Sequence, residues 1–132
     1  MSQSQPMCSF RFKHDPHLRC PHPVEKNGKC IFHLGEPLEK FQEELRSYLE
    51  RLKNDSAEIW DFRGFIFPEP VNWSGETFPK KIDFRGAVFK AEAKFTEAIF
   101  KADAFFRVSN FKAVADFEDS IFEAAHFLGS TF

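Results

Sequence analysis

The sequence has no long apolar run, and its few glycines and cysteines exclude several classes of protein. No stretch approaches the roughly 20 apolar residues of a membrane span, and residues 1–6 are polar, without the hydrophobic region of a signal peptide. None of the six glycines stands in a Gly-x-Gly-x-x-Gly or Walker arrangement, which argues against nucleotide binding. Three cysteines cannot all pair within one chain, so reduced thiols or thiolate ligands fit better than disulfides. We expect a cytoplasmic protein that does not associate with a membrane.

An excess of charge of one sign is lacking as well. The chain of 132 residues has a formal net charge of −2, and residues 1–59 hold nine acidic and nine basic side chains. Residues 60–132 hold eleven acidic and nine basic side chains. This balance gives little support to nucleic-acid binding or to an acidic nucleic-acid mimic. No nucleophile with a base and no pair of carboxylates in a pocket can be recognised, so we do not expect an enzyme.

Phenylalanine, in contrast, is abundant, with 19 Phe against one Tyr and two Trp. From residue 60 onward, aromatic residues recur at alternating steps of five and six, and the last steps are fives. Neither a helix nor a strand has this period. In the later repeats a small Ala or Ser stands two positions before each aromatic residue. This aromatic ladder consists of Phe62, Phe67, Trp73, Phe78, Phe84, Phe89, Phe95, Phe100, Phe106, Phe111, Phe117, Phe122, Phe127 and Phe132.

The spacing of the ladder predicts a solenoid. Every fourth member lies 22 or 21 residues further on, so the rings of successive coils would stack in columns. Each coil would be filled by one aromatic ring per side, with a small neighbour where no second large side chain fits.

Residues 60–132 resemble the pentapeptide-repeat family, whose repeats centre on Leu or Phe with a small residue two positions before, and in particular a Phe-rich subgroup. The resemblance implies an all-β, right-handed quadrilateral β-helix. The first repeats depart from the family pattern because larger residues replace the small one, so we expect a widened or irregular first coil. The departing residues are Trp60, Phe65, Val71, Glu76 and Ile82.

Residues 37–53 predict an amphipathic helix. Leu38, Phe41, Leu45, Leu49 and Leu52 recur at helical spacing, and charged residues occupy the opposite face. We expect this stripe to lie against the first coil, near Trp60 and Phe62, and to protect the open coil end from strand addition. The chain then divides into a zinc-knuckle-like segment at 1–35, a capping helix with its linker at 36–59, and the solenoid at 60–132.

The first segment contains the residues of a closed zinc site. Three cysteines and one histidine have the spacing Cys-x11-Cys-x9-Cys-x2-His, and the final Cys-x2-His pair is compact enough for one tetrahedral ion. Residues 27–33 resemble small knuckles that precede helices and pentapeptide repeats in some bacterial proteins. Two alternatives remain open: unliganded thiols, or His14, His17 or His22 in place of the first cysteine. The predicted ligands of a structural Zn²⁺ are Cys8, Cys20, Cys30 and His33.

The residue after each ladder member should project to solvent, and this position predicts a basic stripe. Asp61 and Asp83 stand two residues before two of the bases, so the alternative is a row of exposed ion pairs with little net effect. If the stripe is a binding site, its ligand should be anionic. The five candidate residues are Arg63, Arg85 and Arg107 in one column, with Lys90 and Lys112 in the next.

We therefore expect a non-enzymatic protein-interaction or scaffold module that binds a protein partner, because solenoids offer regular faces and exposed sheet ends. The alternative is a nucleic-acid-mimic or nucleic-acid-associated protein that acts on a topoisomerase or another DNA-handling partner. Phe122, Phe127 and Phe132 end the sequence without a polar cap. We expect that the native chain is longer or that two chains meet there as an end-to-end homodimer.

Overall fold

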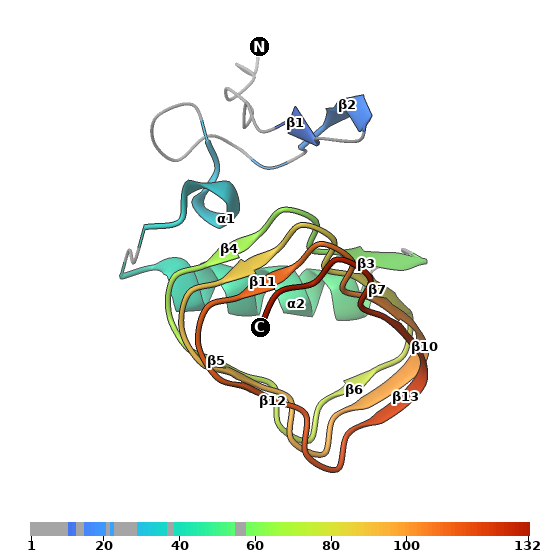
Figure 1. The fold of residues 1–132 in the computed structure, drawn as a ribbon. Helices are drawn as coiled ribbons and strands as arrows, with labels where there is room; N and C mark the ends of the chain where they lie inside the picture. Colours follow the sequence, from blue (N-terminus) through green and yellow to red (C-terminus); the bar gives the residue numbers. More distant parts are fainter. Residues whose placement is uncertain (1–10, 13–14, 21, 23–28, 37–38, 55–57) are drawn as a thin grey trace.

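The computed structural model describes residues 11–12, 15–20, 22, 29–36, 39–54 and 58–132. Within this part of the chain a short antiparallel hairpin comes first, two helices follow, and a β-solenoid makes up the rest (Figure 1). The hairpin was not anticipated from the sequence. The elements before the solenoid are β1 (Arg11–Phe12), β2 (Asp15–Arg19), α1 (Ile31–Leu34) and α2 (Phe41–Asn54).

The solenoid has four sides, and the predicted fold class is confirmed. Its coils appear as nested four-sided loops when they are seen along the axis (Figure 1). All strand pairs between coils are parallel. β10 and β13 are long enough to turn a corner, so each contributes to two sides. The strands are β3 (Ile59–Asp61), β4 (Ile66–Phe67), β5 (Val71–Asn72), β6 (Thr77–Phe78), β7 (Lys81–Asp83), β8 (Val88–Phe89), β9 (Ala93–Lys94), β10 (Ile99–Phe105), β11 (Asn110–Phe111), β12 (Ala115–Asp116) and β13 (Ile121–His126).

The aromatic ladder fills the interior in the predicted columns. Phe62, Phe84 and Phe106 stack with centroids 5.0 Å apart, and Phe67 stacks on Phe89 at 4.5 Å. These separations match the distance between neighbouring strands, so each ring contacts the ring one coil away. The small residues of the middle coils, such as Ala87, are fully buried between the columns.

The expectation of an irregular first coil is wrong. Trp60 pairs with Ile82 in a regular parallel ladder, and Val71 pairs with Ala93. At the start of the solenoid, the helices supply the wall that a preceding coil would otherwise form. Phe65, for example, stacks on Phe32 of α1 with centroids 4.6 Å apart and planes 4° apart.

An irregularity occurs instead near the other end. The pairing of β10 with β13 shifts register between Phe100 and Asp103, because the step from Phe122 to Phe127 is one residue shorter than the corresponding earlier steps. The shift lies at the corner that β10 and β13 turn. The ladder recovers its columns immediately afterwards, since Phe127 stacks on Phe106 at 4.8 Å.

Two corners of the coils are tight turns. At the first, the Phe65 amide donates to the Phe62 carbonyl at 3.1 Å, and Gly64 has φ 69°. A four-residue turn with positive φ only at its third residue is a type II turn, which favours glycine there. Gly86 occupies the same place one coil later with φ 72°.

Helix α2 covers the first coil, as the sequence predicted, and in Figure 1 it lies behind the nested loops, across the end that the first coil forms. Phe41, Leu45 and Leu52 are buried in the core, and Tyr48 contacts the Phe62 ring with centroids 5.5 Å apart. The predicted start at Pro37 is wrong, because residues 39 and 40 form a turn and the helix begins at Phe41. Leu38 lies outside the described residues. Among the described residues, no helix has the length and apolar character that crossing a membrane requires.

Side chains of α2 also satisfy backbone acceptors at the open edge of the first coil. Tyr48 donates its hydroxyl to the Asp61 carbonyl at 2.7 Å, and Gln42 donates its side-chain amide to the Pro70 carbonyl at 3.0 Å. The equivalent carbonyls one coil later accept backbone N–H groups of the first coil at 2.8 Å and 2.9 Å. The helix thus replaces two hydrogen bonds that a preceding coil would make. These two carbonyls are then no longer free to pair with a strand of another chain.

Candidate metal centre

Helix α1 places two of the predicted ligands side by side. Cys30 directly precedes the helix, and its carbonyl accepts the amides of His33 at 3.2 Å and Leu34 at 3.0 Å. One helical turn therefore brings Cys30 Sγ to 3.2 Å from His33 Nδ1. Gly35, in the left-handed region with φ 78°, ends the helix.

Cys20, which follows β2, completes a buried cluster with these two residues. Its Sγ lies 3.9 Å from the Cys30 Sγ, and the three ligand atoms lie within 4.8 Å of one another. All three residues are at most 2% exposed. They are close enough to bind one metal ion. Of the other residues considered, Cys8 and His14 lie outside the described residues, as does the side chain of His17.

The electrostatics of Cys20 fit a metal ligand. The pKa of the Cys20 thiol is lowered to about 4, chiefly by its hydrogen bond with Cys30, although burial acts in the opposite direction. Smaller contributions to this lowering come from His33 and from a backbone hydrogen bond of His22. Thiolates are the form in which cysteine binds metals, so this environment supplies the required protonation state.

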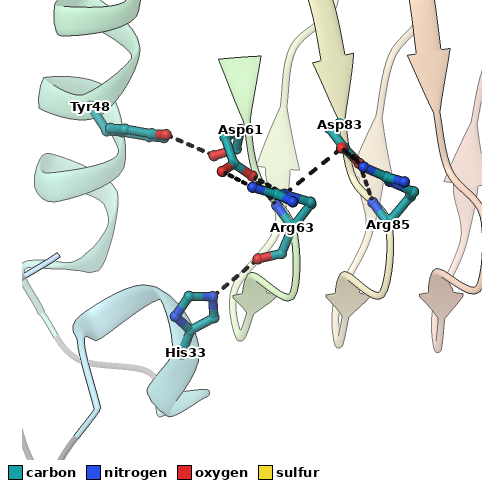
Figure 2. A network of polar contacts seen from close by, with 6 residues as sticks. All are labelled: His33, Tyr48, Asp61, Arg63, Asp83 and Arg85. Carbon is teal, nitrogen blue, oxygen red and sulfur yellow. Dashed lines mark hydrogen bonds and ion pairs between the residues drawn. The ribbon is translucent and has the colours of Figure 1, made fainter. Parts of the chain in front are cut away.

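The second nitrogen of His33 is held by the solenoid. His33 Nε2 lies 3.1 Å from the Arg63 carbonyl oxygen, in the first turn of the first coil (Figure 2). A carbonyl can only accept, so Nε2 carries the proton and Nδ1 presents its lone pair toward Cys30. Such a hydrogen bond behind a histidine ligand fixes the ring and its tautomer.

His22 is buried but is not part of the ligand cluster. Its ring contacts Phe32, Tyr48 and Phe65 edge-on, with centroids 5.0 to 5.8 Å apart. Burial lowers its pKa below the ordinary value. In this arrangement His22 acts as a neutral ring among aromatic rings.

Two of the five bases of the predicted basic stripe are neutralised by aspartates. Arg63 donates to both oxygens of Asp61 at 2.9 and 2.8 Å, and Arg85 binds the buried Asp83 in the same way (Figure 2). Burial raises the pKa of Asp61, but its hydrogen bonds from Arg63 outweigh this effect and leave the pKa below its usual value. This is the ion-paired arrangement that the sequence left open as the alternative.

The other three bases of the stripe differ from these two. The Lys90 ammonium donates to the Gly35 carbonyl at 3.2 Å, so this residue connects the second coil to the end of α1. Arg107 and Lys112 are exposed, and no partner for either occurs within the described ranges. The position two residues before Arg107 is Phe105 rather than an aspartate, which explains why that arginine is unpaired.

Comparisons with protein families, with curated proteins and with solved structures found no match to this chain.

Proposed function

We propose that this protein is a non-enzymatic interaction or scaffold module, built on a divergent pentapeptide-repeat solenoid in the cytoplasm and fixed at its N-terminal side by a structural zinc ion. The observation that carries the zinc assignment is the buried cluster of Cys20, Cys30 and His33. Thiolate and imidazole ligands are those that Zn²⁺ takes in structural sites, where Cys8 would complete a set of three cysteines and one histidine.

Several features favour a module that binds proteins over an enzyme. The solenoid interior is filled by stacked rings, and the hollow between α2 and β5 has a volume of only about 210 Å³. Small-molecule sites are normally concave and enclose most of the ligand. The sides of the coil instead present regular rows of side chains on rigid strands, which suits recognition of a protein surface.

Zinc should bind at one ion per chain. We expect metal analysis of full-length protein purified without chelator to give a 1:1 ratio, and Cys30→Ser to lower zinc affinity by about a hundredfold or more, since loss of a ligand removes a bond to the ion. Cys30→Ser should loosen the N-terminal segment and leave the later coils folded. Complete unfolding would show instead that the metal site nucleates the solenoid, and metal-free wild-type protein would remove the zinc assignment.

We propose Arg107 and Lys112 as the contact residues for an acidic partner surface, since both are exposed and unpaired in the described part of the chain. The double variant Arg107→Glu with Lys112→Glu should weaken the complex by about tenfold at low salt, and less at high salt because exposed charges are screened. Binding is measured by titration against the partner recovered by cross-linking. Lys101→Glu, an exposed base on another side, is the matched control, and equal affinity of all three proteins would exclude this face.

We also propose an end-to-end homodimer through the last coil. Phe132 is 69% exposed, and Phe122 and Phe127 are only partly buried; a second copy stacked on the last coil would bury these ladder rings and continue the sheets. The variant Phe132→Asp should convert dimer to monomer in sedimentation velocity, because it places a charge in the interface. A wild-type protein that is monomeric at high concentration would contradict this proposal.

A further inference from the structure

The Arg63 carbonyl lies at the open edge of the first coil. A preceding coil, if there were one, would supply the hydrogen-bond donor for this carbonyl. In every later coil the equivalent carbonyl accepts a backbone amide: Gly64 donates to Arg85 at 3.0 Å, and Gly86 donates to Arg107 at 3.1 Å. The first coil has no such neighbour in the described chain. His33 Nε2, at 3.1 Å, takes the place of that amide. The imidazole therefore completes a ladder of turn-to-turn hydrogen bonds.

The same ring contributes its other nitrogen to the metal cluster. His33 Nδ1 faces the Cys30 sulfur at 3.2 Å. A metal on Nδ1 requires the proton to be on Nε2, and the Arg63 carbonyl requires the same tautomer. Capping and metal binding thus favour one state of the ring, so each should strengthen the other.

Helix α1 extends this connection. Phe32 lies between Cys30 and His33 in the sequence, and its ring stacks on Phe65 in the first coil. His33 contacts the same Phe65 ring edge-on, with centroids 5.5 Å apart. The turn itself is fixed by Asp61, which accepts the Arg63 amide at 3.0 Å. An ion that holds Cys30 and His33 together therefore also holds the groups that cover the first coil.

We propose that His33 makes metal binding and capping of the first coil one coupled equilibrium, so that release of the metal opens the N-terminal edge of the solenoid. This inference rests on the proposed metal site. By linkage, the factor by which the metal stabilises the cap equals the factor by which the cap strengthens metal binding. The solenoid edge is then a surface whose access depends on the metal.

The first test is hydrogen exchange of the full-length protein with one equivalent of zinc and after treatment with a chelator. Zinc should slow exchange of the amides at residues 62–67 by about tenfold, within the usual range of coupling between two sites. The amides at residues 106–111, two coils away, should not change and serve as the internal control. Wild-type protein that binds one zinc with identical exchange at 62–67 overturns the coupling and leaves the metal site intact. Protein that binds no zinc contradicts the metal site itself.

The variant His33→Cys separates the two roles of the residue. A thiolate can still bind zinc but has no second donor for the Arg63 carbonyl. We expect this variant to bind one zinc and to lose most of the protection at residues 62–67. Full protection in this variant would assign the effect to α1 packing and overturn the role of the imidazole.

The reciprocal effect is tested with a matched pair, Gly64→Ala and Gly86→Ala. Both place alanine at the positive-φ position of a type II turn, but only the first turn accepts the hydrogen bond from His33. Gly64→Ala should lower zinc affinity by about fivefold, the lower end of typical couplings, and Gly86→Ala should leave it unchanged. Equal zinc affinities of the two variants would count against the coupling.

Discussion

Replacing Phe84 by alanine is expected to lower the free energy of unfolding by about 3–5 kcal/mol, the cost of removing a large aromatic side chain from a core. Phe84 is fully buried and is stacked between Phe62 and Phe106, each 5.0 Å away. The cavity would interrupt a column of rings, and the rigid strands on either side cannot move together to fill it. Urea unfolding followed by circular dichroism measures the loss.

The matched control is Phe132→Ala, at the end of a neighbouring column. Phe132 is 69% exposed and stacks on Phe111 through one face only. Most of its ring is already in contact with water, so its removal should cost far less. Similar losses for the two variants would contradict a core whose stability comes from rings enclosed between coils.

Removal of residues 1–53 is expected to convert the protein to associated or insoluble forms. The deletion exposes Phe65 and Phe67, and it takes away the donors that satisfy the carbonyls of Asp61, Arg63 and Pro70. Unpaired edges of this kind template the addition of another strand. Sedimentation velocity over a range of concentrations measures the association.

A second variant keeps the helix and removes two of its edge contacts. Tyr48→Phe combined with Gln42→Ala preserves the packing of α2 but leaves two edge carbonyls without these donors. Association weaker than that of the truncated protein is expected. A truncated protein that stays monomeric at high concentration would show that the helix does not protect the edge.

Much of the fold could be predicted because it depends on a repeated spacing. The positions of Phe62, Phe84 and Phe106 follow from one period, and every column that the spacing predicted is present in the structure. The start of α2 could not be predicted in this way, since Glu39 and Lys40 suit a helix surface as well as a turn. The four-residue α1 was missed, although Gly35 after a Cys-x2-His pair was a usable signal for a short helix end.

The candidate metal site was predictable in composition but not in its surroundings. The spacing of Cys30 and His33 indicated a shared ion. Cys20 was included because a structural zinc site needs further thiolate ligands. The hydrogen bond of His33 to Arg63, and that of Gln42 to Pro70, join residues 30 and 28 positions apart. Such contacts have no local sequence signal, because they arise only when the helices lie on the first coil.

The register shift at the corner of β10 and β13 indicates where this fold tolerates a change in chain length. One residue is missing there relative to the earlier coils. Phe127 and Phe132 nevertheless stack on Phe106 and Phe111, the rings of the coil before. The corner absorbs the difference because Lys101 projects outward and no ladder ring lies at that point. Within a side, one inserted residue would turn a buried ring to solvent. Insertions and deletions in related chains should therefore collect at corners or comprise whole coils.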